Sequence, residues 1–338
     1  MNNILIRTGG GRAKGKELGL GHIYRTINLA KELKYNKIYF SLEDFGGAKE
    51  ILQKNGFNKI ETVMNKIKTE QDFKNTKLQI EKWKIDIVII DRYKISKLYV
   101  KKLSKIIKVV IISDLLDLNF KANLIVNGFI GFKNQITKNK LNSKCMIGPN
   151  FQILNKEFSK MNKKNIKKWD LLISFGGYDE KNIIEVILKI LPDYLNKLKV
   201  KIILGPVAKK NSELNKLQKK YSKNLHVKNS TKNMAKEMRN TKYGLCTGGL
   251  TTYEFACMKI PTGIISDDNH QIITAKQWQK LGFAKNLGII NKNSESKIRI
   301  FVDEVYERKF LTRNRKRMVD GLGSKRVANE ILKMKENH

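Results

Sequence analysis

The sequence predicts an α/β protein with two doubly wound domains and a cleft between them. Short apolar runs alternate with amphipathic stretches, and this alternation starts again after residue 168 of the 338. The apolar runs are continuous, with no polar residue at every second position, which is typical of parallel strands buried on both faces of a sheet. Two such series indicate two Rossmann-like parallel sheets, each covered by helices.

The first half, residues 1–154, is expected to form the N-terminal domain. Buried apolar runs mark its strands, and stretches with helical periodicity mark its helices. The strands are 4–7, 38–41, 85–90, 109–113, 124–126 and 145–147, and the helices are 23–33, 47–53, 70–83 and 96–106. The polar stretch 155–168, rich in lysine and asparagine, is expected to be a linker.

The second half, residues 169–310, repeats the pattern and is expected to form the C-terminal domain. The strands are 171–174, 200–204, 243–246 and 262–265, and the helices are 181–190, 212–220, 234–239, 251–258 and 271–281. The last segment, 311–338, is expected to be helical, with a break near 321–323.

The charge balance is strongly basic, with 68 Lys and Arg against 31 Asp and Glu and a formal net charge of +37. Such a charge favours phosphorylated substrates, nucleic acid or an anionic membrane surface as partners. The lysines are spread along the chain and the sequence holds no nucleic-acid-binding motif, so composition bias is the stronger interpretation. We therefore expect no nucleic acid partner, and peripheral contact with an anionic membrane stays an alternative.

Three cysteines, Cys145, Cys246 and Cys257, form no Cys-x-x-Cys pair. Their odd count and spacing argue against a disulfide framework or a zinc site, so no metal and no cofactor is expected. The first residues have a strand pattern and no secretory leader, and no apolar run reaches the roughly 18 residues of a membrane span. A cytoplasmic protein is expected, and the sequence does not indicate its oligomeric state.

A glycine-rich stretch follows the first strand and ends at His22, where the first helix begins. Glycine lets a backbone approach a ligand closely, and a helix N-terminus presents N–H groups to an anion. The stretch lacks the Gly-x-x-x-x-Gly-Lys-Ser/Thr pattern of a P-loop and is a poor dinucleotide fingerprint. His22 is therefore a candidate general base, with Gly21 beside it and Arg25 one turn further on. From position alone, a structural hydrogen bond is an equally good interpretation of His22.

Two glycine pairs recur in the second half. Gly176 and Gly177 follow one strand, and Gly248 and Gly249 follow another. Each pair lies between the end of a strand and the start of a helix, where backbone N–H groups can hold a diphosphate. Tight turns without a ligand are the alternative, and two pairs at one sheet edge favour the phosphate interpretation.

Polar residues follow these turns. Thr251 and Thr252 can add hydroxyl donors, and Glu254, early in the next helix, can accept hydrogen bonds from ribose hydroxyls. His270 and Gln271 begin a further helix at the same edge. Compensation of the helix dipole by Glu254 and simple N-capping of the later helix are the structural alternatives.

The chain resembles a known family in these motifs. The segments that carry the resemblance are 19–25, 90–93, 148–151, 174–179, 248–254 and 320–323. In them the chain is similar to UDP-2,4-diacetamido-2,4,6-trideoxy-β-L-altropyranose hydrolases and to related glycosyltransferases of spore-coat polysaccharide synthesis. More distantly, it resembles the N-acetylglucosaminyl transferase of peptidoglycan synthesis. All share the GT-B architecture.

The resemblance implies a UDP-sugar substrate whose UDP is held by the second domain. The segment from Gly248 to Glu254 would face the diphosphate and the ribose. His22 would activate a water that attacks the anomeric carbon and expels UDP with inversion, without a metal. Asp91 and Tyr93 would line the sugar side, and Arg7 would also contact the substrate. The pathway implied is the synthesis of pseudaminic-acid-like sugars or of a surface polysaccharide.

Some positions depart from the hydrolase pattern. Gly9 replaces a usual aspartate, His270 replaces an asparagine, and the stretch before His22 is longer and carries Arg12, Lys14 and Lys16. These departures lie around the expected sugar pocket and leave the sugar and the acceptor open. Transfer to a glycan is the main alternative. A UDP-sugar 2-epimerase and a non-catalytic nucleotide-sugar or RNA-binding protein rank lower.

Overall fold

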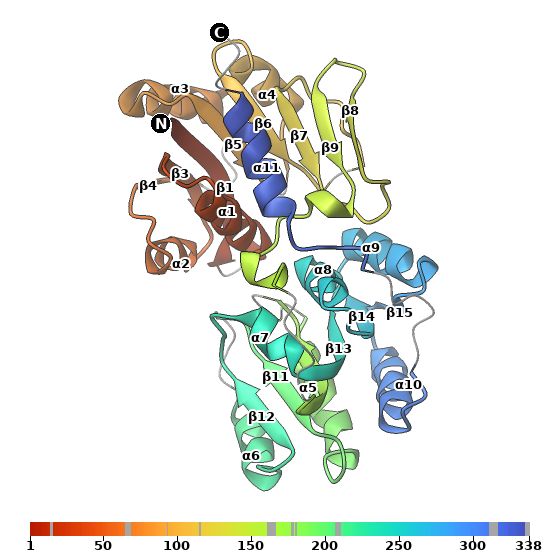
Figure 1. Ribbon diagram of the computed structural model, residues 1–338. Coiled ribbons are helices and arrows are strands. Elements are labelled where there is room, and N and C mark those ends of the chain that lie inside the picture. Colours follow the sequence, from red (N-terminus) through yellow and green to blue (C-terminus); the bar gives the residue numbers. More distant parts are fainter. Residues whose placement is uncertain are drawn as a thin grey trace. The chain divides into compact units, whose positions relative to one another are not determined.

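The computed structural model describes residues 1–13, 16–64, 69–92, 94–114, 116–160, 167–176, 179, 181–206, 211–310 and 317–334. The chain forms two compact units, of which the first comprises Met1–Lys156 with Gly321–His338 and the second Glu157–Asp320. Each unit is built on a largely parallel sheet with helices around it (Figure 1). The α/β class with two doubly wound units is thus confirmed, and the cleft stays a prediction.

The first unit has a sheet with the strand order β4-β3-β1-β5-β6-β7-β9-β8, and β2 pairs with β1. Its strands are β1 (Asn3–Ala13), β2 (Lys16–Leu18), β3 (Lys37–Asp44), β4 (Ile60–Val63), β5 (Ile87–Asp91), β6 (Lys108–Ile112), β7 (Leu124–Asn127), β8 (Gln135–Lys138) and β9 (Lys144–Ile147). Pairing is parallel except for β1 with β2 and β8 with β9. The order reverses between β1 and β5, which is where open α/β sheets bind ligands.

Helices surround this sheet. They are α1 (Gly21–Glu32), α2 (Ala48–Lys54), α3 (Thr69–Trp83), α4 (Lys97–Leu103) and α11 (Gly323–Lys333), with a 3-10 turn η1 (Pro149–Phe151). Helix α11 comes from the far end of the sequence and packs beside α1 (Figure 1). It is tied there by Ser324, which donates to the Leu154 carbonyl, and by Arg326, which donates to the Asn150 carbonyl at 2.9 Å.

The second unit has a six-stranded parallel sheet with the order β12-β11-β10-β13-β14-β15. Its strands are β10 (Trp169–Ser174), β11 (Val200–Ile203), β12 (Leu225–Lys228), β13 (Thr241–Thr247), β14 (Thr262–Ser266) and β15 (Ala284–Ile289). Its helices are α5 (Ile183–Ile190), α6 (Ser212–Lys220), α7 (Met234–Arg239), α8 (Leu250–Cys257), α9 (Asn269–Lys280) and α10 (Ser294–Tyr306), with 3-10 turns η2 (Lys156–Phe158) and η3 (Leu191–Asp193). Here the order reverses between β10 and β13.

Each unit has its own apolar core, as the continuous apolar strands require. In the first, residues of β5 and β6 such as Val88 and Ile111 are fully buried against Tyr99 of α4. In the second, Ile187 of α5 and Phe301 of α10 cover the sheet. The burial of side chains on both faces explains why the strand pattern does not alternate.

The structure corrects several local expectations. The glycine-rich stretch after Arg7 is not a loop throughout, because β1 continues to Ala13 and pairs in parallel with β3 up to Gly10 and Asp44. The helix expected within 311–338 is described only as α11, which belongs to the first unit. Residues 311–316 and 335–338 lie outside the described residues.

Candidate functional site

In the first unit, the candidate residues meet at the strand-order reversal. Asp91 is the last residue of β5, and His22 is the second residue of α1, which begins shortly after β1. Gly10 allows this closeness, because a Cβ there would lie 2.6 Å from Cγ1 of Ile23. The start of α1 therefore lies directly on the end of β1, beside β5.

His22 and Asp91 form a hydrogen-bonded dyad. His22 Nδ1 lies 2.7 Å from Asp91 Oδ1, and Asp91 has no exposed surface. An ionised carboxylate only accepts hydrogen bonds, so the Asp91 contact favours the tautomer with the proton on Nδ1, in which Nε2 can accept one; Arg25 NH2 lies 3.1 Å from the same Nδ1. His22 keeps 15% of its side chain exposed, so solvent or substrate can reach it. This is the geometry of a general base with a buried orienting acid.

Arg25 completes the group from the next turn of α1. Its Nε donates to Asp91 Oδ2 at 2.8 Å, and its NH2 donates to Asp91 Oδ1 at 2.6 Å. Its NH1 donates at 2.5 Å to Asp114, which follows β6. All three nitrogens of the guanidinium therefore serve protein carboxylates, so Arg25 holds the dyad in place; contact with a substrate stays a prediction.

The charges of this group reinforce one another. Burial alone raises the pKa of Asp91, but the charges of Arg25 and then His22 more than offset it, so the pKa lies below its usual value. Burial lowers the pKa of Arg25, but Asp114 and Asp91 outweigh it and raise the pKa well above normal. Asp91 is thus a carboxylate and Arg25 a cation throughout the physiological range.

A second charged cluster lies beside the dyad. Arg7 has no exposed side-chain surface; its Nε donates to Asp72 at 3.0 Å and its NH2 lies 3.5 Å from Glu43. Arg92, next to Asp91 in sequence, closes the ring with contacts of 2.5 Å to Asp72 and 2.7 Å to Glu43. Arg7 therefore lies inside the protein and holds two carboxylates, which corrects the expectation that it contacts the substrate.

Three carboxylates that pair with the arginines of this site were not predicted from the sequence: Asp114, Glu43 and Asp72. Asp114 had a usable signal, since it follows a buried strand that ends at the same sheet edge as β5. Glu43 and Asp72 had no such signal, because they lie within a strand and a helix. Tyr93 and Gly177, two predicted site residues, lie outside the described residues.

In the second unit, the glycine turns also follow the strands at the order reversal. Gly176, after β10, has φ +76°, a conformation that favours glycine. Gly248, after β13, donates its N–H to Oε1 of Gln271 at 2.8 Å, and a Cβ there would lie 2.7 Å from the Gln271 carbonyl. Gln271 therefore ties this turn to the start of α9, and the Gly248 amide is already used.

The N-terminus of α8 has room for an anion. Gly249 is its N-cap residue without a side-chain hydrogen bond, and nothing lies within 4 Å of a Cβ built there. The first N–H groups of a helix generally have no partner within the helix and attract negative charge. In α8 the Thr252 N–H already donates to the Gly249 carbonyl at 3.1 Å, so the groups that precede it are the candidates. Open space at Gly249 and the uncapped end are what a phosphate would need.

The remaining predicted residues of α8 differ in availability. The Thr252 hydroxyl donates to the Gly249 carbonyl at 2.8 Å and accepts from Trp278 Nε1 at 3.0 Å, so it is internally satisfied. Thr251 is 8% exposed and Glu254 is partly buried. Burial raises the pKa of Glu254 to about 7, so this carboxyl changes its charge near neutral pH. Such a shifted group at a sheet edge is a candidate ligand contact.

The start of α9 combines capping with exposure. Asp268 is the N-cap residue and accepts from the Gln271 N–H at 2.8 Å, which confirms the capping alternative for this helix. His270 is exposed in the first turn. Its position therefore permits contact with a ligand, and its role stays a prediction.

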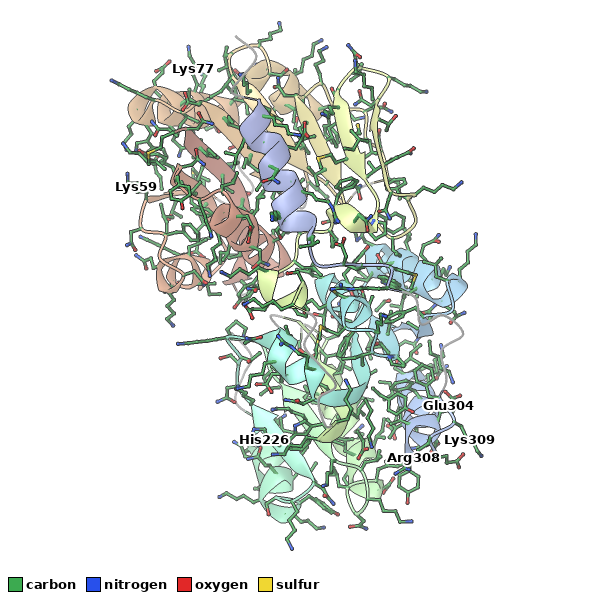
Figure 2. All side chains as sticks on the ribbon, viewed as in Figure 1. Lys59, Lys77, His226, Glu304, Arg308 and Lys309 are labelled. Atoms are coloured by element: carbon green, nitrogen blue, oxygen red, sulfur yellow. The ribbon has the colours of Figure 1, made fainter. Side chains whose placement is uncertain are left out.

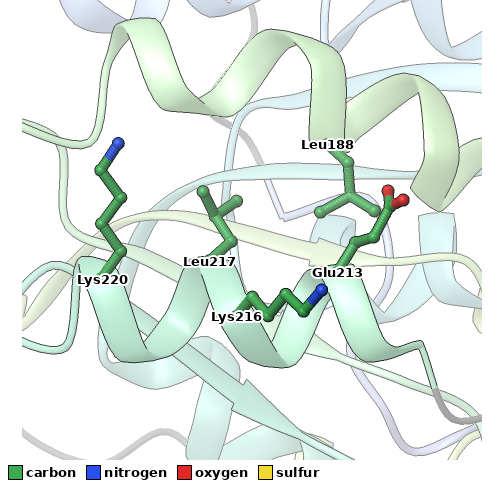
Figure 3. Close-up of a pocket in the computed structure, with 5 residues that line it drawn as sticks. All are labelled: Leu188, Glu213, Lys216, Leu217 and Lys220. Carbon is green, nitrogen blue, oxygen red and sulfur yellow. The ribbon is translucent and has the colours of Figure 1, made fainter.

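Other surface features lie elsewhere. A pocket between α5 and α6 is lined by Leu188, Glu213, Lys216, Leu217 and Lys220 (Figure 3). None of the predicted site residues lines it. Basic side chains such as Lys77 on α3 and Lys309 after α10 lie at the surface of both units (Figure 2).

Two features are absent from the part of the chain that the structure describes. No group of three or more His, Cys, Asp or Glu side chains is arranged there to hold a metal ion. No helix there is both long and apolar enough to cross a membrane.

Comparison of sequences finds distant relatives, although no protein-family model matches the chain. The chain is 32% identical over 275 residues to an uncharacterized protein of Methanocaldococcus jannaschii, covering 75% of this chain and about half (54%) of that protein. It is 23% identical to the spore coat polysaccharide biosynthesis protein SpsG of Bacillus subtilis, over 81% of each chain. It is 27% identical to the UDP-2,4-diacetamido-2,4,6-trideoxy-β-L-altropyranose hydrolase of Campylobacter jejuni, over 79% of this chain and 94% of that enzyme.

Comparison of structures shows the fold. MurG of Acinetobacter baumannii superposes with a TM-score of 0.63 at 16% identity, covering 99% of this chain and all of MurG. MnaA of S. aureus, solved with UDP, superposes with a TM-score of 0.59 at 12% identity, covering 99% of this chain and 97% of MnaA. The chain thus has the GT-B fold and is a distant relative of SpsG and the altropyranose hydrolase.

Proposed function

We propose that this protein hydrolyses a UDP-linked deoxyamino sugar and releases UDP, with His22 as general base. The observation that carries the proposal is the His22–Asp91 dyad at the strand-order reversal of the first unit. A histidine whose Nδ1–H is held by a buried carboxylate can take a proton at Nε2 and form a stabilised imidazolium. The buried carboxylate and the arginine that holds it favour this role for His22 over a single structural hydrogen bond.

The chemical step needs three events. His22 Nε2 takes a proton from a water while the water oxygen bonds to the anomeric carbon. The bond from that carbon to the β-phosphate oxygen breaks, and its electron pair leaves with UDP. Attack from the face opposite the leaving group inverts the anomeric centre. Asp91 keeps the imidazole oriented and stabilises the charge that His22 gains.

The second unit is proposed to bind the UDP moiety. The uncapped start of α8 at Gly249 would carry the diphosphate, because N–H groups and the helix dipole favour the negative charge of the leaving group. Glu254 would accept hydrogen bonds from the ribose hydroxyls in its ionised form. Thr251 and His270 are further proposed contacts, while Gln271 and Thr252 support the turn.

The sugar class rests on the Campylobacter jejuni relative, whose name states a diacetamido-trideoxy altropyranose substrate. The proposed pathway is the synthesis of a surface polysaccharide, which the name of SpsG supports, since it states spore coat polysaccharide biosynthesis. A pseudaminic-acid-like product and a cytoplasmic location are part of the proposal and rest on the resemblance and the sequence alone. Glycosyl transfer is the second candidate, favoured by the fold shared with the rhamnosyltransferase SpnG at a TM-score of 0.58.

The test is release of UDP from a panel of UDP-sugars without any acceptor, including the diacetamido-trideoxy altrose derivative. Release with multiple turnovers, lost in His22→Gln, supports the hydrolase. Binding of UDP without turnover contradicts hydrolysis and supports transfer to an acceptor.

A further inference from the structure

The side of α3 that packs on the sheet of the first unit is polar, and we propose that it holds an internal water site between Arg7, Ser41 and Gln79. The inference goes beyond the proposed function, because it concerns the inside of the first unit and needs no substrate. Three features support it: the polarity of this side of α3, three buried atoms without a partner, and a small side chain among long ones.

The buried residues of α3 are all polar, namely Asp72, Thr76 and Gln79. Positions i, i+4 and i+7 lie on one side of a helix. Asp72 accepts from Arg7 Nε at 3.0 Å, and the Gln79 amide donates to Glu61 at 2.9 Å, so this side faces the sheet. Apolar burial usually holds a helix on a sheet, but this part of the contact is polar, and its groups need hydrogen-bond partners.

Three buried atoms of this polar layer have no hydrogen-bond partner among the described residues: Arg7 NH2, Ser41 Oγ and Gln79 Oε1. Arg7 has no exposed surface, and Ser41 and Gln79 are each 1% exposed. Arg7 NH2 lies 3.5 Å from Glu43, which is an ion pair without a hydrogen bond. The three atoms are a donor, a hydroxyl and an acceptor. A water both donates and accepts, so it can satisfy this set, whereas leaving the atoms unpaired would destabilise the fold.

The strand register brings these groups together. Ser41 on β3 lies in register with Arg7 on β1 and with Glu61 on β4, and both pairings are parallel. Neighbouring strands are about 4.8 Å apart, so these three residues lie side by side on one face of the sheet. The Gln79 amide, which is bound to Glu61, therefore lies over the same row.

Ser41 also provides room for a water. Its neighbours on this face are long: Arg7 and Glu61 across the strands, and Tyr39 and Glu43 two residues away along β3. Tyr39 stacks on the tryptophan of α3 with ring centroids 4.9 Å apart, so long side chains hold the helix above the sheet. A small side chain among long ones leaves space beneath the helix, and a buried polar space takes up water.

The water site supports the edge that carries the candidate dyad. It completes the hydrogen bonding of Arg7, which holds Asp72 at 3.0 Å. Asp72 in turn holds Arg92, the residue after Asp91, at 2.5 Å. The water is therefore a structural ligand of the cluster beside the dyad, and it takes no part in the proposed reaction.

The direct test is a high-resolution crystal structure of the wild-type protein. The expected result is a water bonded to Ser41 Oγ and to at least one of Arg7 NH2 and Gln79 Oε1. An ordered layer in which Ser41 Oγ bonds only to protein groups, or to nothing, overturns the inference.

Thermal unfolding gives an independent test. Ser41→Ala removes one partner of the water, so Tm should fall by about 2–4 °C. Ser143→Ala is the matched control, because Ser143 lies in the same unit, is 2% exposed, and has a hydroxyl that donates to the Phe120 carbonyl at 2.8 Å and accepts from the Ala122 N–H at 3.0 Å. A similar fall is expected in both variants. A Tm of Ser41→Ala at or above the wild-type value, beside a fall in Ser143→Ala, would mark the Ser41 hydroxyl as unpaired and overturn the inference.

Discussion

Glu254 offers a prediction that needs no substrate. Its carboxyl is partly buried in α8, and burial raises its pKa from 4.5 to about 7. Between these values the folded protein binds a proton that the unfolded chain releases, so stability falls as pH rises through this window. The neutral amide of Glu254→Gln has nearly the shape of the protonated acid and avoids the buried charge.

The magnitude follows from the shift. A full shift of this size costs about 3 kcal/mol at pH 8, and partial exposure reduces it, so Glu254→Gln should gain about 1–3 kcal/mol there. At pH 5 the gain should be small, since the folded wild type is already protonated. Guanidinium unfolding of both proteins at pH 5 and pH 8 measures the difference.

The matched control is Glu213→Gln, which removes an exposed carboxyl in the first turn of α6. It should change stability little at either pH. Equal stability of wild type and Glu254→Gln at pH 8, or a gain of the same size at pH 5, would refute the reasoning that burial holds a proton on Glu254.

Three further predictions concern binding and turnover. The affinity for a UDP-sugar should rise up to about tenfold from pH 6 to pH 8 as Glu254 ionises, since the diphosphate itself does not titrate near neutrality. Isothermal titration of Glu254→Gln should show no such rise. Gly249→Ala should leave the melting temperature near wild type but weaken UDP binding at least about tenfold. Gly248→Ala should instead lose about 1–3 kcal/mol of stability, because its Cβ meets Gln271. Equal UDP binding in wild type and Gly249→Ala would contradict a phosphate at that turn. Asp91→Asn should lower kcat about 100- to 10,000-fold with UDP affinity unchanged, and a loss in affinity alone would contradict its role.

The strand ends could be predicted from the sequence because each follows a continuous apolar run. This placed both glycine turns at strand ends, as the structure has them, whereas the place of Asp91 in the site was implied only by the family resemblance. The extent of β1 could not be predicted, because glycine has a low strand propensity and pairing decides the outcome, with β3 up to Gly10 and with β2 from Gly11 to Ala13. Tertiary pairing thus overrides the local pattern of residues 9–13.

The roles of arginines were harder to predict. Arg7 was expected to contact the substrate, yet it is buried against Asp72, which lies 65 residues away along the chain; Asp114, the partner of Arg25, lies 89 residues away. A single sequence carries no signal for such distant ion pairs. The pattern therefore predicts which groups lie at an edge, and only the structure shows which of them neutralise one another.

The measurement that tests the central claim most directly is single-turnover UDP release by wild type and His22→Gln, with UDP affinity measured on both. We expect His22→Gln to bind UDP as wild type does, because the proposed nucleotide contacts belong to the second unit, and its rate of release to fall at least about 100-fold. Release at the wild-type rate by a folded His22→Gln protein would contradict the assignment of His22 as the base.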